Sequence, residues 1–155
     1  SPHTAWLLTR SIDTLRIRTK EAISSAMKVA TFLHKHKNIN KVLYPGFEQS
    51  KVQMSRARKQ CNYIGYSGGS LLSFCVKGGQ DEAYKVLNAL NVIKLAVSLG
   101  GTQSLAEHPR THTHADVPIE DQNKFGISPS MIRLSVGQEN VRDIIYDLSQ
   151  ALNQI

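Results

Sequence analysis

Four short apolar segments, each ending at a turn that contains glycine, constrain the fold of this chain more than any other feature. They are residues 39–44, 70–76, 93–99 and 131–136. Short apolar runs rich in β-branched residues that stop at Gly or Pro are typical of strands. The stretches around them carry apolar residues at helical spacing. The pattern predicts an α+β fold in which a mainly antiparallel sheet of about four strands is covered by helices.

The predicted helices occupy residues 2–36, 50–60, 81–90 and 141–152. The first range holds two helices or one bent helix, and Pro2 suits a first helical position, where proline loses no backbone hydrogen bond. We expect residues 1–36 to be linking helices and residues 37–155 to form the α+β domain. The chain opens on a helix without an initiator methionine, which we interpret as a cut within a longer polypeptide.

Composition argues against several classes of protein. The 155 residues, 41% hydrophobic and 20% charged, suit one soluble domain. No run approaches the roughly 18 apolar residues of a spanning helix, and no signal-peptide pattern opens the chain. We therefore expect a cytoplasmic protein without a membrane partner. The net charge of +7 suits a nucleic-acid partner, but Lys and Arg are spread along the chain without interleaved aromatics, so we expect none.

The cysteines and histidines do not form a recognisable metal or disulfide pattern. Cys61 and Cys75 are not in a CxxC pair, so we interpret both as ordinary buried or half-buried thiols. His108, His112 and His114 stand in HPRTHTH, and a His-x-His segment suggests metal binding. Because no Cys, Asp or Glu stands at a spacing that completes a zinc shell, we expect no metal.

Arg133 is the most informative single residue. Strand alternation places it on one face with Met131 and Ser135. A buried and unpaired charge costs several kcal/mol, so this guanidinium requires an anionic partner. An Asp or Glu of the same domain and the carboxylate of a ligand both satisfy that requirement. Ser98, before a Gly pair, either approaches a ligand at a strand end or only precedes a chain reversal.

Several motifs follow one another along nearly the whole chain. They are SPHTAWLLTRSIDTLRIR, AMKVATFLHKH, VLYPG, LLSFCVKGG, LAVSLGGTQSLAEHP, THTH and GISPSMIRLSVGQENVRDIIYDLSQAL. Together they resemble the C-terminal domain of the cysteine/methionine metabolism family of pyridoxal-phosphate-dependent enzymes, of fold type I. This family includes methionine gamma-lyase, cystathionine gamma-lyase and cystathionine gamma-synthase. SLGG, SLAEHP and RLSVG are the most specific of these motifs.

The resemblance implies that pyridoxal phosphate is held on a lysine of an upstream domain that is absent from these residues. This chain would then hold no catalytic residue, and alone it should be inactive. Its implied role is to bind a sulfur-containing amino acid. Arg133 would bind the substrate α-carboxylate, Ser98 would hydrogen-bond the same carboxylate, and Thr113 would support the arginine. On this interpretation the ligand neutralises Arg133, and no internal acid is needed.

The implied function is carbon–sulfur bond cleavage in methionine, cystathionine or a related amino acid, within the homotetramer of the family. Cystathionine gamma-synthase or a homoserine-ester sulfhydrylase is the alternative within the family. A non-catalytic small-molecule or nucleic-acid-binding module is the alternative from another class. SLAEHP and THTH resemble the gamma-lyases more than bacterial cystathionine beta-lyase.

Overall fold

The computed structural model describes residues 1–47, 51–60 and 68–155. Its helices are α1 (Pro2–Asp13), α2 (Leu15–Lys35), the 3-10 turn η1 (Pro45–Phe47), α3 (Lys51–Gln60), α4 (Gln80–Ala89), α5 (Ile119–Lys124) and α6 (Val141–Leu152). Its strands are β1 (Ile39–Leu43), β2 (Leu71–Val76), β3 (Lys94–Leu95), β4 (Leu105–Glu107) and β5 (Met131–Ser135). The predicted α+β class is confirmed.

The described strands form one five-stranded sheet with the order β1-β2-β5-β4-β3. The pairs β1–β2, β2–β5 and β4–β5 are antiparallel, and β3–β4 is parallel. The mainly antiparallel character is thus confirmed, with one strand more than expected. The additional strand is β4, a three-residue segment between β3 and the His-rich loop.

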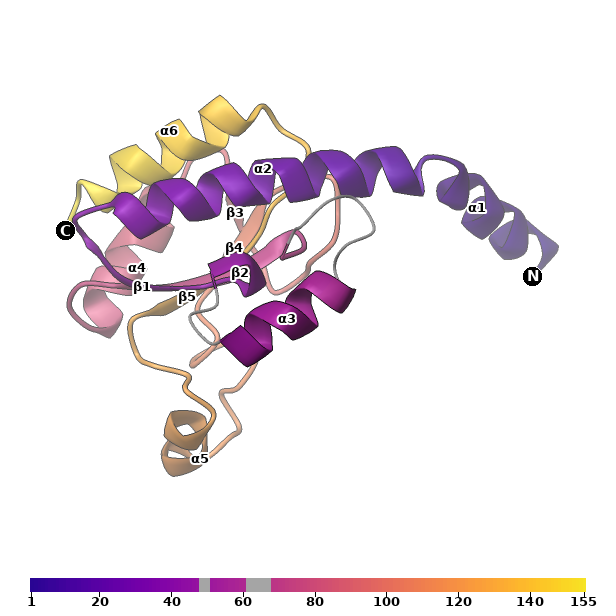
Figure 1. Cartoon of the computed structure of the whole chain (residues 1–155). Coiled ribbons are helices and arrows are strands. Elements are labelled where there is room, and N and C mark those ends of the chain that lie inside the picture. The colour runs from indigo at the N-terminus through magenta and orange to yellow at the C-terminus, as the bar shows by residue number, and fades with distance from the viewer. Residues whose placement is uncertain (48–50, 61–67) are drawn as a thin grey trace.

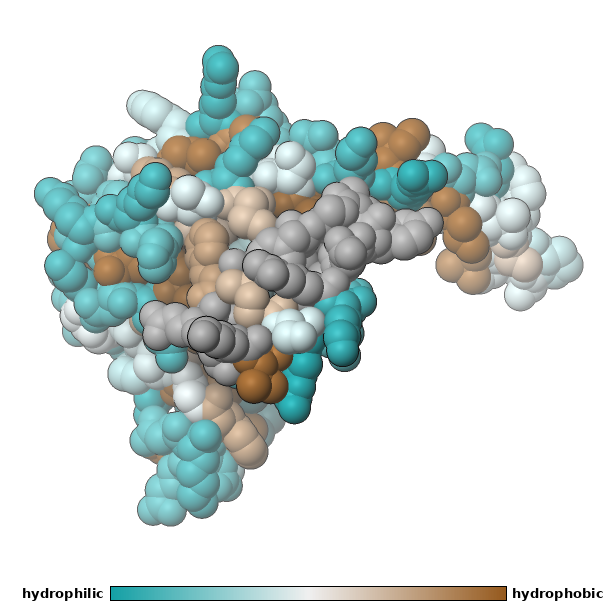
Figure 2. All heavy atoms as spheres, viewed as in Figure 1, coloured by the Kyte–Doolittle hydropathy of each residue, from teal (hydrophilic) through white to brown (hydrophobic). Residues whose placement is uncertain are grey.

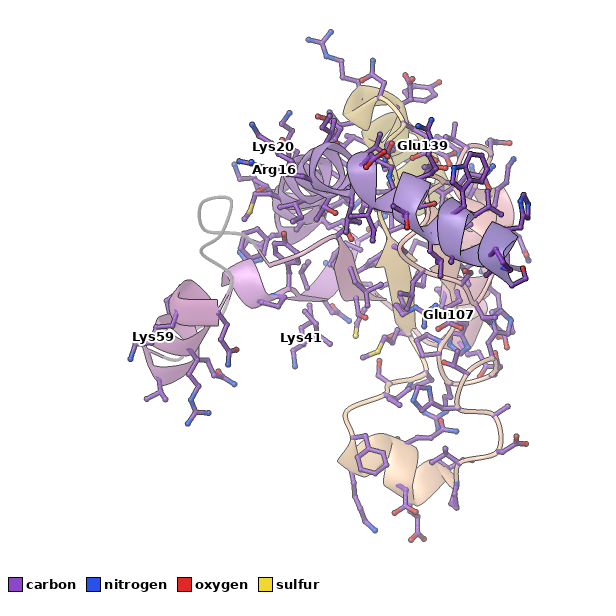
Figure 3. The ribbon with its side chains drawn as sticks, turned by 90° about the vertical axis from the view of Figure 1, so that its right-hand side faces the viewer. Arg16, Lys20, Lys41, Lys59, Glu107 and Glu139 are labelled. Atoms are coloured by element: carbon purple, nitrogen blue, oxygen red, sulfur yellow. The ribbon has the colours of Figure 1, made fainter. Side chains whose placement is uncertain are left out.

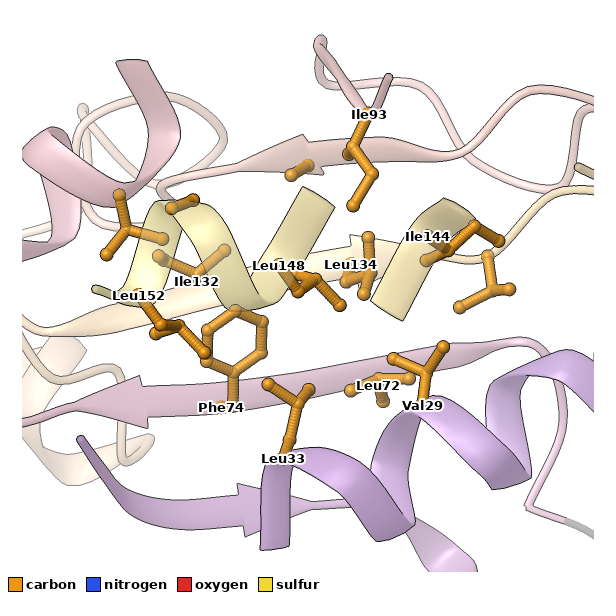
Figure 4. Packing of buried hydrophobic residues seen from close by; sticks show 14 of the residues in the cluster. Val29, Leu33, Leu72, Phe74, Ile93, Ile132, Leu134, Ile144, Leu148 and Leu152 are labelled. Atoms are coloured by element: carbon orange, nitrogen blue, oxygen red, sulfur yellow. The ribbon is translucent and has the colours of Figure 1, made fainter. Parts of the chain in front are cut away.

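One face of the sheet carries the hydrophobic core. Strands β2 and β5 alternate, so that Leu72, Phe74, Ile132 and Leu134 are all buried on the same side. Helices α2, α4 and α6 cover this side, and Figure 4 shows side chains of α2 and α6 meeting those of the two strands. Helices therefore cover one face of the sheet, and the opposite face carries Arg133 and Ser135.

Helix α1 differs from α2, α4 and α6 because none of its residues is buried. It extends away from the sheet beyond the start of α2 (Figure 1). Large apolar side chains on α1 and the first turn of α2 are exposed, namely Trp6, Leu7, Leu8, Ile12, Leu15 and Ile17. Brown surface marks this end of the molecule in Figure 2. Later residues of α2, from Ala22 to Leu33, join the core with the sheet.

Two segments depart from the sequence expectation. The strand predicted over residues 93–99 pairs in the sheet only at Lys94–Leu95, because the chain after Ala96 bends toward the face that lacks helices. Helix α5 was not expected, since six residues are too few to show helical periodicity. Cys75 is buried, as predicted, while Cys61 and Ser50 lie outside the described residues. No helix in the described ranges has the length and apolar content needed to cross a membrane.

Candidate substrate-carboxylate site

Arg133 lies in the middle of β5, on the face of the sheet that the helices leave free. Its direct neighbours in the register are Ser73 on β2 and Glu107 on β4. Directly opposite residues of antiparallel strands point to the same face, so the three side chains form one row across the sheet. The predicted alternation along β5 is confirmed, because Ile132 and Leu134 enter the core on the other face.

The guanidinium of Arg133 is paired with the carboxylate of Glu107. Nη1 lies 2.8 Å from Oε1, and the two side chains are 17% and 0% exposed. The expectation that Arg133 needs no internal acid is therefore wrong, since an acid of the same sheet already neutralises it. Removing one partner of such a buried pair costs about 3–5 kcal/mol, because the other charge stays behind unpaired. The pair explains why this sheet tolerates an arginine.

The other terminal nitrogen of Arg133 holds the SLGG loop. Nη2 donates to the carbonyl oxygen of Val97 at 2.7 Å and to that of Ser98 at 3.3 Å. The backbone N–H of Gly100 donates to Oγ of buried Ser135 at 2.9 Å. Arg133 and Ser135, from the same face of β5, therefore hold this loop against the sheet. Ser98 is an exposed residue, like the rest of this loop.

Thr113 reaches Arg133 through Glu107. Its hydroxyl donates to Oε1 of Glu107 at 3.2 Å, the same oxygen that faces the guanidinium. The second oxygen, Oε2, is buried and has no hydrogen-bond partner among the described residues. Nδ1 of His112 lies 3.8 Å from it, on a side chain that is 34% exposed. Glu107 is therefore surrounded by groups that can donate to it or balance its charge.

A second network joins the loop after SLGG to the segment after β5. Glu139, which Figure 3 labels together with Glu107, accepts from both the backbone N–H of Ser104, at 2.6 Å, and its hydroxyl, at 2.8 Å. Gly137 donates its N–H to Oγ of Ser104 at 2.9 Å. A Cβ on Gly137 would collide with the backbone carbonyl of Thr102. The motifs RLSVG and SLGGTQS are thus in contact, although more than thirty residues separate them in the chain.

The three histidines of HPRTHTH take separate roles. His108 is fully buried between Oγ1 of Thr111 at 2.9 Å and the Pro129 carbonyl at 2.8 Å, and its ring packs against Tyr84. Burial lowers the pKa of His108 more than the Pro129 contact raises it. His114 contacts Thr113. Within the described ranges, no group of three or more His, Cys, Asp or Glu side chains is arranged to hold a metal ion.

Chemically, this arrangement suits the recognition of a carboxylate. A guanidinium has five N–H donors in a planar fork. Nη2 donates to the carbonyls of Val97 and Ser98, and Nη1 forms an ion pair with Glu107. None of these contacts uses Nε, and the side chain is 17% exposed, so Arg133 keeps a donor for a further acceptor. Arg133 is the only one of these groups that carries a fixed positive charge.

The sequence identified three residues that the structure connects in one region, namely Arg133, Ser98 and Thr113. Their roles toward a substrate stay a prediction. Sequence reasoning missed Glu107, which links Thr113 to Arg133, because β4 is too short to display alternation. A signal was present: Glu107 is the acid in SLAEHP, and an arginine among apolar residues requires an acid close by.

Sequence comparison finds a matching family model and several similar proteins. A family model described as "Cys/Met metabolism PLP-dependent enzyme" matches residues 1–153. An L-methionine gamma-lyase of Fusobacterium nucleatum subsp. polymorphum is 40% identical over 154 residues, which are 99% of this chain and 38% of the relative. A cystathionine gamma-lyase of Rattus norvegicus is 42% identical over 152 residues, 98% of this chain and 37% of that protein.

A cystathionine beta-lyase of Coxiella burnetii is 40% identical over 152 residues, 98% of this chain and 38% of the relative. This identity equals that of the Fusobacterium lyase, so overall similarity does not separate beta-lyases from gamma-lyases. The chain spans 37–38% of the length of these three relatives.

Proposed function

The chain belongs to the Cys/Met metabolism PLP-dependent enzyme family, and from this premise we propose that it binds the substrate carboxylate in a carbon–sulfur lyase. In this proposal residues 37–155 form the C-terminal, substrate-binding domain, preceded by the linking helices of residues 1–36. The substrate is a sulfur-containing amino acid such as methionine or cystathionine, in keeping with the names of the relatives.

The observation that supports the proposal is the setting of Arg133. Its guanidinium is held on two sides, by Glu107 and by the carbonyls of the SLGG loop, yet 17% of the side chain is exposed. A cation fixed in this way loses little conformational freedom when it binds a carboxylate. Ser98 on the same loop offers a hydroxyl. Binding through these groups would orient the amino acid for the reaction.

The groups around Arg133 do not suit the phosphate of the family's cofactor. Apart from the guanidinium itself they are a carboxylate and backbone carbonyls, which accept hydrogen bonds and offer a phosphate no donor. In our proposal pyridoxal phosphate is held by a lysine in the rest of the enzyme. When bound, its ring withdraws electrons from the substrate Cα. The residues of this chain hold the substrate carboxylate.

The exposed apolar side chains of α1 fit the proposal that these residues are part of a larger assembly. Trp6, Leu8 and Ile12 are 57%, 63% and 65% exposed, and exposed apolar patches of this kind mark contact surfaces. We assign the contact to the remainder of the enzyme, which the length of the relatives implies, within a cytoplasmic homotetramer. Light scattering of the full-length protein measures the mass of this assembly.

The experiment that tests the proposal compares Arg133→Leu with wild type in the full-length protein. Because hydrogen bonds to a charged group are worth about 1.5–3 kcal/mol, kcat/KM for L-methionine and L-cystathionine should fall about a hundredfold. Bound cofactor, measured by its visible absorption, should be unchanged. Arg142→Leu is the matched control, since Arg142 is exposed at the start of α6. An unchanged kcat/KM in Arg133→Leu would rule out this carboxylate site.

A further inference from the structure

Glu107 carries an unusual combination of properties for an acidic residue. It is 0% exposed, it lies on the short strand β4, and it faces Arg133 directly in the register. A buried acid of this kind is costly unless other groups neutralise it and donate to it. Its Oε1 lies 2.8 Å from Nη1 of Arg133, the residue that we propose to bind substrate.

The two oxygens of Glu107 are not equivalent. Oε1 is bound to Arg133 and to the hydroxyl of Thr113. Oε2 has no hydrogen-bond partner among the described residues, although it is buried, and only the ring of His112 at 3.8 Å lies toward it. A carboxylate whose purpose was stability alone would be expected to have both oxygens satisfied. The contacts of this carboxylate are therefore concentrated on Oε1, the oxygen that faces the guanidinium.

The contacts of Glu107 fix the orientation of the guanidinium plane. Arg133 is held at Nη1 by the carboxylate and at Nη2 by the carbonyls of Val97 and Ser98. Two anchors on different nitrogens define the plane, whereas a single anchor leaves rotation about the long side chain. Misplacement of a recognition group by about 1 Å is enough to cost a large factor in rate.

We infer that Glu107 is a positioning residue for substrate recognition: it sets the guanidinium of Arg133 in the plane in which that group donates to an amino-acid carboxylate. The inference rests on the proposed function, because it assigns to Glu107 an effect that passes through Arg133. Thr113 assists by donating to the same oxygen of Glu107. Glu107 itself does not contact the substrate.

The test uses two unreactive ligands of the full-length holoenzyme that differ only in the carboxylate. L-norleucine has the shape of methionine without sulfur, and pentylamine is the same molecule without its carboxylate. Inhibition constants for both are measured in wild type, Glu107→Gln, Arg133→Leu and the double variant. Glu107→Gln keeps the shape of the side chain. Asp121→Asn is the matched control, because Asp121 pairs with Lys124 on exposed α5, away from Arg133.

Glu107→Gln should weaken the binding of L-norleucine about tenfold, because Arg133 stays in place but loses one of its two anchors, and it should leave the binding of pentylamine unchanged. In the Arg133→Leu background the same substitution should have no further effect, since interacting residues are not additive. Asp121→Asn should resemble wild type with both ligands. If Glu107→Gln folds poorly, Thr113→Val provides the second variant, with a smaller loss confined to L-norleucine.

The following results overturn the inference. Equal weakening of both ligands would make Glu107 a purely structural residue. Unchanged or tighter binding of L-norleucine would show that Glu107 only neutralises Arg133, or competes with the ligand for it. Unchanged binding of both ligands in Arg133→Leu would remove the carboxylate site, and thus the proposed function together with this inference. Loss in Arg133→Leu with no effect of Glu107→Gln removes the inference alone.

Discussion

Arg133 and Glu107 are direct neighbours across β5 and β4, and the register of these two strands brings Nη1 within 2.8 Å of Oε1. The pair lies on the sheet face opposite to α2, α4 and α6, so the helices that stabilise the fold do not cover it. Because a one-residue slip would move either side chain to the other face, the same pairing that builds the sheet also builds the site.

Two buried serines should respond in opposite ways to the same substitution. Ser104 donates to Glu139 and accepts from the N–H of Gly137, so Ser104→Ala should lower the free energy of unfolding by about 1–3 kcal/mol. Oγ of Ser25, in the middle of α2, is buried and has no hydrogen-bond partner among the described residues. Ser25→Ala should raise stability by about 1 kcal/mol. Urea denaturation measures the free energy of unfolding of both variants. A change in the same direction in both would contradict the prediction.

Gly137 should tolerate no side chain. A Cβ there would overlap the Thr102 carbonyl and the backbone of Gln103. Gly137→Ala should therefore cost about 1–3 kcal/mol by overpacking and displace the SLGG loop from Arg133. Gly126→Ala is a useful comparison, because its Cβ would meet open space and only its positive φ opposes the change. Denaturation midpoints that are lowered equally would show that close approach at Gly137 is unimportant.

Asp147 should make the fold sensitive to acid. Burial raises the pKa of this carboxyl, but the hydrogen bonds donated by the backbone N–H groups of Ile93, Asn91 and Val92 together lower it by more. The pKa of Asp147 therefore lies below the ordinary value of 3.8. Since the folded pKa is depressed, its contribution is complete above the unfolded value and is lost as pH falls through the folded value. Unfolding free energy measured between neutral pH and pH about 3 should fall more steeply in wild type than in Asp147→Asn.

His108 should affect stability at milder pH. Burial depresses the pKa of its imidazole below 6.5, so the folded chain favours the neutral ring. The unfolded chain then binds more protons, and stability is complete above pH 6.5 and falls as the pH drops toward the folded pKa. His108→Gln should be less stable at pH about 7.5 and should lose this slope. The same slope in wild type and variant, measured by thermal unfolding, would assign the effect to another group.

Periodicity and turn residues predicted most of the fold. Strands β1, β2 and β5 and helices α1, α2, α4 and α6 have enough residues to show their pattern. Strand β4 does not, since it has only three residues, and of the strand predicted over residues 93–99 only Lys94–Leu95 pairs in the sheet. Their placement depends on long-range contacts with β5, which a local pattern does not contain. The exposure of Trp6 and Ile12 could not be predicted either, because helical spacing does not show what an apolar side chain packs against.

The site was predicted in part. Arg133 was identified because a charge within an apolar strand requires a partner, and that reasoning holds. It did not choose between ligand and protein as the partner, and the structure shows Glu107 in that place. Contacts such as Ser135 with Gly100, or Glu139 with Ser104, join residues 35 positions apart. Only the sheet topology brings such residues together.

The most direct test of the account is a crystal structure of the full-length holoenzyme with L-norleucine bound. The account predicts a ligand carboxylate oxygen about 2.7–2.9 Å from a nitrogen of Arg133, as in other charge-assisted hydrogen bonds, with Glu107 still on Nη1. A ligand carboxylate held by other residues, with Arg133 in contact only with Glu107 and the carbonyls of Val97 and Ser98, would contradict it.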